Sequence, residues 1–398
     1  MARLTPLAAL PEPPPRSGSG HLQDWARAPL PLLEEGARRA RDGGGSLFRL
    51  RLGLPAVLGF SPEWNRRVLT DLPTFRSAGT FPRLVPFIGG GIVLTDAPEH
   101  RARRRVLNPA FGRSELEALR GRVRLARPPV PTGEFNALDW ADHAVLRMLN
   151  AAYFSGEFPE GLLHAFLAPL RRPFPHPALP RPRLFARVRA ELDGLARRRR
   201  GEGGGDDLLA VLAPLPGGLE EVRISLAAAH DTTTHALAWT MWHLARHPQW
   251  HTPEGHPAAL KETLRLYPPG WMGSRRLGAG LEWEGVPLPR GTLVLYSPYL
   301  SARDPERWQA PGEFQPQRWQ TSPPAWSYLP FGGGERTCLG MHLAHLIILE
   351  ALAALPPLSP LGGDPVPWAG VTLGPVGPVR VRAAGDSALR SVARPGRD

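Results

Sequence analysis

The sequence contains 398 residues, 42% of them hydrophobic, and it carries a formal net charge of +12. Lys261 is the only lysine, so 47 of the 48 basic residues are arginine, and these are spread over expected helices and loops. The spread indicates a biased coding composition rather than a nucleic-acid-binding surface.

The composition also limits the compartment and the cross-links. Cys338 is the single cysteine, which excludes an intramolecular disulfide. No apolar run approaches the roughly 18 residues that cross a membrane, and residues 1–20 are proline-rich rather than patterned as a signal peptide. We therefore expect a soluble, cytoplasmic protein without a transmembrane anchor, with residues 1–20 as a loose N-terminal arm.

The first third of the chain contains one strand signal and one helix start. Alternating apolar residues over 47–59 predict a strand and a turn. Asp96 and Pro98 mark the start of a helix on which His100 and Arg104, four residues apart, share a face. From the residues alone, this face is either a solvated basic surface or part of a site.

The middle of the chain reads as helical and is less informative. Residues 138–216 carry helical patterns interrupted by prolines. The aromatic residues there, Tyr153, Phe154 and Phe166, are either core or lining of a binding site, and we favour core.

Residues 218–247 predict one long helix that is ended by Pro248. Its centre, Ala228-Ala229-His230-Asp231-Thr232-Thr233, is polar, although aspartate and threonine are poor residues for a helix interior. A threonine hydroxyl can bond its own backbone there and loosen the helix. This polar run indicates either an ordinary helix bend or a functional site.

Two further segments precede the cysteine. Residues 258–267 predict a helix on which Glu262 and Arg265, three apart, can form an ion pair. Residues 271–300 contain alternating and β-branched stretches that predict a small sheet.

Cys338 lies between a glycine-rich turn and an apolar segment, residues 341–355, that reads as a helix. Three consecutive glycines, 332–334, allow positive φ and the close approach of a flat ligand. A cysteine just before a helix N-terminus is expected to favour the thiolate, the form that binds metal. Arg336 adds a cation that can hold an acidic ligand group. The alternative is a small buried apolar residue after a loop.

The spacing Phe331-x-x-Gly334-x-Arg336-x-Cys338-x-Gly340 resembles the haem-ligand signature of the cytochrome P450 family. The resemblance extends over most of the chain, from about residue 98 to residue 381. It implies a mainly α fold with small β-sheets, in which residues 21–385 form a single haem domain and residues 386–398 a C-terminal tail. It also implies heme b as the cofactor, with Cys338 as the thiolate ligand of its iron.

The same resemblance assigns roles to other residues. The segment around His100 and Arg104 is similar to the family segment that holds a haem propionate. Arg275, thirteen residues after Glu262, matches the spacing of a second propionate-binding arginine, with Arg276 as the alternative.

The polar run in the long helix resembles the oxygen-activation motif of the family. Asp231 and Thr232 would therefore relay protons, although Ala229 stands where the family often has glycine. Thr233 is the alternative hydroxyl. The Glu262–Arg265 pair would be structural, with Arg318 as its third member.

The activity implied is that of a monooxygenase that inserts oxygen into an apolar substrate. Short pieces around residues 267–271 and 291–299 are similar to bacterial enzymes that hydroxylate carotenoid rings, so the end ring of a carotenoid is the predicted target. A fatty acid or a small terpene is the alternative. Because no flavin- or nicotinamide-binding segment follows the haem region, we expect a separate ferredoxin or flavodoxin with its reductase. A haem-thiolate sensor without turnover is the rival class, and a nucleic-acid-binding protein is a distant third.

Overall fold

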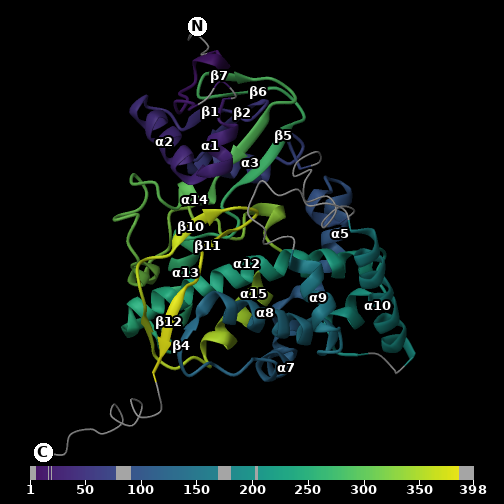
Figure 1. Cartoon of the computed structure of the whole chain (residues 1–398). Coiled ribbons are helices and arrows are strands. Elements are labelled where there is room, and N and C mark those ends of the chain that lie inside the picture. The colour runs from purple at the N-terminus through teal and green to yellow at the C-terminus, as the bar shows by residue number, and fades with distance from the viewer. Residues whose placement is uncertain are drawn as a thin grey trace, which may run out of the picture.

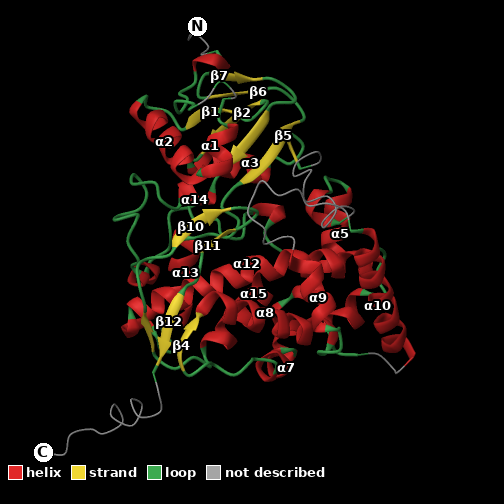
Figure 2. Ribbon diagram, in the orientation of Figure 1, coloured by secondary structure: helices red, strands yellow, loops and turns green. Residues whose placement is uncertain are grey.

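The computed structural model describes residues 6–16, 18, 20–77, 91–168, 181–201 and 205–384. Helices make up most of the regular structure, and strands gather in small sheets (Figure 1, Figure 2). The α-helices are α1 (Leu22–Arg27), α2 (Pro29–Asp42), α3 (Pro62–Thr70), α5 (Glu99–Leu107), α6 (Arg113–Ala118), α7 (Arg120–Leu125), α8 (Ala137–Phe154), α9 (Glu160–Leu167), α10 (Pro182–Gly201), α11 (Leu208–Leu212), α12 (Gly218–Arg246), α13 (His256–Leu266), α14 (Pro298–Ser301) and α15 (Met341–Leu352). The strands are β1 (Leu47–Arg51), β2 (Pro55–Gly59), β3 (Phe75–Arg76), β4 (Gly133–Asn136), β5 (Gly273–Leu277), β6 (Leu281–Trp283), β7 (Val286–Leu288), β8 (Leu293–Tyr296), β9 (Leu358–Pro360), β10 (Val366–Ala369), β11 (Leu373–Val376) and β12 (Arg380–Ala383). The predicted class, mainly α with small β-sheets, is confirmed.

Helix α12 runs through the helical part of the molecule and organises it (Figure 1). It has 29 residues, follows Gly217 in the left-handed conformation, and stops before Pro248, which cannot continue a helix. The single long helix predicted over 218–247 is therefore confirmed. Helices α8, α13 and α15 all pack against α12.

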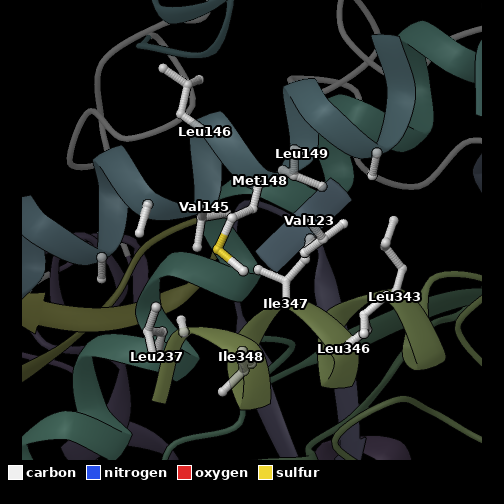
Figure 3. Close-up of a cluster of buried hydrophobic side chains, with 14 of the residues drawn as sticks. Val123, Val145, Leu146, Met148, Leu149, Leu237, Leu343, Leu346, Ile347 and Ile348 are labelled. Carbon is white, nitrogen blue, oxygen red and sulfur yellow. The ribbon is translucent and has the colours of Figure 1, made fainter. Parts of the chain in front are cut away.

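The main hydrophobic core lies where α7, α8, α12 and α15 meet. Figure 3 shows Met148 of α8 close to Ile347 of α15, with Leu237 of α12 and Val123 of α7 in the same cluster. All four side chains are buried, and each contributes roughly 1.5–3 kcal/mol to folding by leaving water. This core fixes α12 relative to α15, the helix that follows Cys338.

The largest sheet has the strand order β1-β2-β8-β5-β3. Where one strand and a turn were predicted over 47–59, strands β1 and β2 form an antiparallel hairpin, with Leu47 opposite Gly59. Strand β2 then pairs in parallel with β8, and β8 pairs antiparallel with β5. Since side chains alternate along a strand, Arg275 and Arg276 of β5 point to opposite faces of this sheet.

Three smaller sheets complete the β structure of the described residues. Strand β12 lies between β4 and β9, while β10 pairs with β11 and β6 pairs with β7. All of these pairings are antiparallel.

A buried ion cluster centred on Glu262 fastens α13 to the segment before the cysteine loop. The Glu262 carboxylate accepts hydrogen bonds from Arg265 at 2.8 and 3.1 Å and from Arg318 Nε at 3.0 Å. Arg265 also donates to the backbone carbonyls of Ala302 and Pro311. The predicted pair and its third member are therefore in contact, and they connect three segments of the chain.

The chain ends lie partly outside the described residues. Residues 1–20 were expected to form a loose arm, and in the described part Glu12 accepts hydrogen bonds from Arg49 and Arg51 while Leu10 is buried. The predicted tail, 386–398, lies outside the described residues. Among the residues that the structure describes, no helix has the length and apolarity to cross a bilayer.

Candidate active site

Glycines and one backbone hydrogen bond shape the loop that carries Cys338. Gly332 and Gly334 adopt φ of +69° and +63°, a conformation that favours glycine. A Cβ on Gly334 would also lie 2.7 Å from the carbonyl oxygen of Leu69. The Cys338 N–H donates to the Phe331 carbonyl at 2.8 Å, which closes the loop directly before α15. Two of the three glycines thus use the positive φ that the sequence predicted.

A cavity of about 440 Å³ lies against this loop. Its lining comes from the cysteine loop, α5, α8, α12 and β5, among other segments. The lining includes all seven predicted cofactor-binding residues: His100, Arg104, Arg275, Phe331, Arg336, Cys338 and Gly340. Residues that are far apart in the sequence therefore meet at one site.

The Cys338 thiol is exposed to this cavity, and the protein surrounds it on its other sides. Burial raises the pKa of the Cys338 thiol, and the Gly340 backbone hydrogen bond and the Arg104 charge oppose this only in part. The expectation that the loop and helix alone favour the thiolate is therefore wrong, because burial penalises the charged form more strongly. A coordinated metal cation reverses that preference.

Arg275 and Arg336 bring two positive charges to the cavity. Arg336 donates hydrogen bonds to the Thr95 carbonyl and to Asp96, and Arg275 donates to the Ser274 carbonyl at 2.7 Å. The Nε atoms of both arginines are buried and have no hydrogen-bond partner among the described residues. Burial and then the Arg275 charge lower the pKa of Arg336. An anion in the cavity would give the two Nε atoms a hydrogen-bond partner and would stabilise the charged form of Arg336.

Arg276 differs from its neighbour in its surroundings. Its Nη1 donates to the carbonyl of Gly291 at 3.0 Å, and the cavity lining includes Arg275 instead. Of the two arginines that the sequence left open, Arg275 is the one that reaches the cavity.

Helix α5 contributes His100 and Arg104 to the same cavity. His100 is buried, its Nδ1 lies 3.2 Å from Oε1 of Glu335, and burial together with the Arg336 charge lowers its pKa. Burial likewise lowers the pKa of the Arg104 guanidinium, which lies near Cys338 and Glu335. The two residues share the cavity side of α5, whereas Arg105 is exposed.

Helix α12 supplies the polar run. Thr232 lines the cavity, and its hydroxyl donates to the Ala228 carbonyl at 2.9 Å, which is the backbone contact predicted for this position. Ala228, Ala229 and Thr233 line the cavity as well. Asp231 is buried but is not part of the lining, and its Oδ1 lies 3.5 Å from Nδ1 of His230.

Two polar lining residues, Glu221 and Ser225 of α12, escaped the sequence reasoning. Tyr153 of α8, for which core was favoured, also lines the cavity and is hydrogen-bonded to Ser225. Glu221 accepts a hydrogen bond from the Ile92 N–H at 3.0 Å, and burial raises the pKa of its carboxyl. Following the face of Thr232 back along the helix by seven and eleven residues would have found Ser225 and Glu221.

Two of the three aromatic residues left open between core and lining, Phe154 and Phe166, are not part of the lining. Phe154 packs on Phe158 at a centroid distance of 4.9 Å, and Phe166 packs on Phe185. The preference for core is confirmed for Phe154 and Phe166. The aromatic lining consists of Phe111, Tyr153, Tyr296 and Phe331, so Tyr153 serves the cavity as well as the core.

These residues fit heme b. A flat apolar macrocycle with two carboxylates needs an apolar cavity and cations at its rim, and its iron needs a donor atom. The cavity offers apolar side chains, the buried Nε atoms of Arg275 and Arg336, and the Cys338 sulfur. The Cys338 thiolate and the two charged guanidinium groups are unfavourable in the protein alone, and an iron porphyrin would stabilise all three.

Comparison with known proteins also supports heme b as the cofactor. A family model described as Cytochrome P450 matches residues 256–355. Cyclooctatin synthase of Streptomyces melanosporofaciens is 28% identical, with 90% of this chain and 92% of the relative covered. Cyclooctat-9-en-7-ol 5-monooxygenase of the same organism is 29% identical, with 86% and 88% covered.

A solved structure agrees with these relatives. The crystal structure of CYP175A1 from Thermus thermophilus has a TM-score of 0.72 and 28% identity, and covers 92% of this chain and 97% of its own. The cysteine loop, the cavity and these likenesses together show that the chain belongs to the cytochrome P450 family and is a monooxygenase that uses heme b.

Proposed function

We propose that this P450 monooxygenase hydroxylates a terpenoid hydrocarbon skeleton. The observation that carries the proposal is the cavity itself, in which the Cys338 sulfur and the Thr232 hydroxyl belong to one mainly apolar lining. Ile224, Ala228 and Ala229 of α12 present only hydrocarbon there. A substrate with few polar groups matches such a lining, because burying its apolar surface drives binding at roughly 25 cal/mol per Å².

Cofactor binding is assigned to the residues around the cavity. The Cys338 sulfur would coordinate the iron, and the guanidinium groups of Arg104, Arg275 and Arg336 would face the propionates, with His100 beside them. Phe331 and Gly340 would flank the sulfur. When bound, the haem supplies the activation of O₂ and the insertion of one oxygen atom into the substrate.

The role of α12 is to supply protons beside the cavity. The Thr232 hydroxyl donates to Ala228 in the resting arrangement, so it can turn and hold a proton at Oγ1 for the cavity. Asp231, adjacent in the chain and buried, would renew that proton. Thr233 also lines the cavity and is the alternative hydroxyl.

The proposed substrate class draws on the relatives. The name of one relative contains cyclooctat-9-en-7-ol, a cyclic terpenoid alcohol. A cyclic terpenoid is therefore the first candidate for this chain. The end ring of a carotenoid, predicted from short pieces of the sequence, belongs to the same isoprenoid chemistry and remains a second candidate. A fatty acid is the third.

Electrons would come from a separate acidic protein, a ferredoxin or a flavodoxin with its reductase. The exposed charges of Lys261 and Arg113 act on His345, whose ring lies 5.1 Å from that of Phe331 in the cysteine loop. An acidic protein that binds at these exposed cations would come close to the cysteine loop.

A substrate panel tests the proposed function. Purified holoenzyme is supplied with a surrogate ferredoxin pair and offered cyclooctat-9-en-7-ol, β-carotene and a long-chain fatty acid in parallel. Products are identified by mass spectrometry. A monohydroxylated terpenoid supports the proposal, hydroxylation at the carotenoid end ring supports the second candidate, and turnover of the fatty acid alone contradicts both.

A further inference from the structure

His230 is a buried imidazole between two carboxylates. It stands in the centre of the polar run of α12 and is fully buried. Its Nε2 lies 3.3 Å from Oδ1 of Asp142 on α8, and its Nδ1 lies 3.5 Å from Oδ1 of Asp231. One ring therefore connects a carboxylate of a neighbouring helix with the carboxylate assigned to proton supply.

The contacts of His230 differ from those of an ordinary buried histidine. Within the described part of the chain, neither of its ring nitrogens has a formed hydrogen bond, although both lie at ion-pairing distance from a carboxylate. His243, also buried on α12, shows the structural arrangement, since its Nδ1 is 2.9 Å from the hydroxyl of Thr263. Buried polar groups are nearly always hydrogen-bonded when their role is purely structural.

The two carboxylates differ in their access to solvent. The Asp142 side chain is 16% exposed, whereas the Asp231 side chain is 6% exposed and that of His230 is 0% exposed. The three side chains therefore form a path that leads from solvent toward the cavity. Asp142 on α8 is its outer end, His230 is its middle, and Asp231, next to Thr232, is its inner end.

We propose that His230 relays protons from Asp142 to Asp231, as a positioning residue that acts through Asp231. The inference rests on the proposed function of Asp231 and Thr232. In each step Nε2 accepts the proton of the Asp142 carboxyl while the proton on Nδ1 passes to Asp231 Oδ1. Asp142 regains a proton from water, and the ring returns to its first tautomer when a water molecule carries the proton from Nε2 to Nδ1. One proton enters and one leaves, so the ring carries no lasting charge.

The first test follows the imidazole itself and needs no turnover. The Cε1 hydrogen of a histidine exchanges with deuterium through the protonated ring, and mass spectrometry of the holoenzyme measures its rate. Asp142→Asn removes the anion beside Nε2 of His230 and should slow exchange at His230, while the rate at His243 stays unchanged. An unchanged rate at His230 would overturn the contact on which the relay depends.

The second test measures how O₂ is reduced. Peroxide formed per O₂ consumed is recorded with a surrogate ferredoxin pair, with and without cyclooctat-9-en-7-ol. A relay predicts that His230→Gln and Asp142→Asn each raise the fraction of consumed O₂ that appears as peroxide. Each should also raise the solvent deuterium isotope effect on O₂ consumption. The relay also predicts that the double variant is no worse than either single one. His243→Gln, a buried histidine on the same helix, is the matched control.

Two outcomes separate this inference from the function beneath it. If Thr232→Ala raises the peroxide fraction but His230→Gln does not, the relay through His230 is wrong and the proposed role of Thr232 stands. If Thr232→Ala also leaves the peroxide fraction unchanged, the proposed roles of Asp231 and Thr232, on which the relay rests, are wrong. A loss of thermal stability in His230→Gln without a rise in peroxide would make His230 a structural tie and overturn the relay.

Discussion

The positive charge of Arg275 acts on Arg336, and after burial it is the largest cause that lowers the pKa of the Arg336 guanidinium. Both side chains line the cavity, and both have a buried Nε atom without a hydrogen-bond partner among the described residues. Two like charges in one partly buried site destabilise each other unless an anion joins them. The carboxylates of the cofactor supply that anion in the proposed arrangement.

Removing one of these charges should weaken cofactor retention. Arg275→Ala loses a charge-assisted hydrogen bond to a carboxylate, which is worth about 1.5–3 kcal/mol, so haem should leave roughly 10- to 150-fold faster. The rate is measured by transfer of haem to apomyoglobin. Arg276→Ala is the matched control, since Arg276 bonds the Gly291 carbonyl instead. Equal losses in both variants would contradict the assignment.

Thr232→Ala should keep cofactor and ligand binding but divert reducing equivalents to peroxide. A positioned proton donor typically contributes a factor of about 100 or more, so product per NADH oxidised should fall by at least about tenfold. Thr240→Ala is the control, because Thr240 lies on α12 and bonds the Ala236 carbonyl within the core. Normal coupling in Thr232→Ala would move the role to Thr233 or remove it from this helix.

The Glu262 cluster should be a determinant of stability. Glu262→Gln leaves the Arg265 and Arg318 guanidinium groups with a neutral partner, and breaking a buried pair costs about 3–5 kcal/mol. Urea unfolding of the holoenzyme measures the loss. Asp364→Asn disrupts an exposed pair with Arg246 and should change little. A similar loss of unfolding free energy in the two variants would show that the buried Glu262 cluster stabilises the fold no more than an exposed ion pair does.

Stability should also fall in mild acid because of His243. Burial lowers the pKa of His243 from its ordinary 6.5 to about 3. As the pH falls below 6.5 the unfolded chain takes up this proton and the folded chain does not. The free energy of unfolding therefore falls through this window by up to about 1.4 kcal/mol per pH unit.

His243→Gln tests this linkage. The variant should show a flatter dependence of unfolding free energy on pH between about 6.5 and 5, measured by urea unfolding. The absolute stability of the variant is not the readout, because His243 also packs on Phe314 at a centroid distance of 4.2 Å. A slope equal to that of the unmodified protein would mean that His243 is not neutral in the folded state.

The sequence predicted those parts of the site that depend on local pattern. The Phe331–Gly340 spacing, the four-residue spacing of His100 and Arg104, and the long helix ended by Pro248 all follow from residues near one another in the chain. The structure brings these segments to one cavity. The strand alternation of β5 then decided between Arg275 and Arg276.

Features that depend on long-range packing could not be predicted. Asp142 stands in an ordinary helical stretch, and nothing in its neighbours indicates a contact with His230 across α8 and α12. The thiol of Cys338 was expected to ionise from its place before a helix, but burial depends on the whole cavity and acts in the opposite direction. Tyr153 was assigned to the core and its place in the cavity lining was missed, because its partner, Ser225, comes from a different helix.

The most direct measurement is the absorption spectrum of the reduced, carbon monoxide-bound protein and of its Cys338→Ser variant. A cysteine thiolate donates more electron density to iron than a serine oxygen does, and it gives the carbonyl complex a Soret band at unusually long wavelength. The unmodified protein should show this band, and Cys338→Ser should lose it. A long-wavelength band that survives in Cys338→Ser, or its absence from the unmodified holoenzyme, would contradict the assignment of Cys338 as the iron ligand.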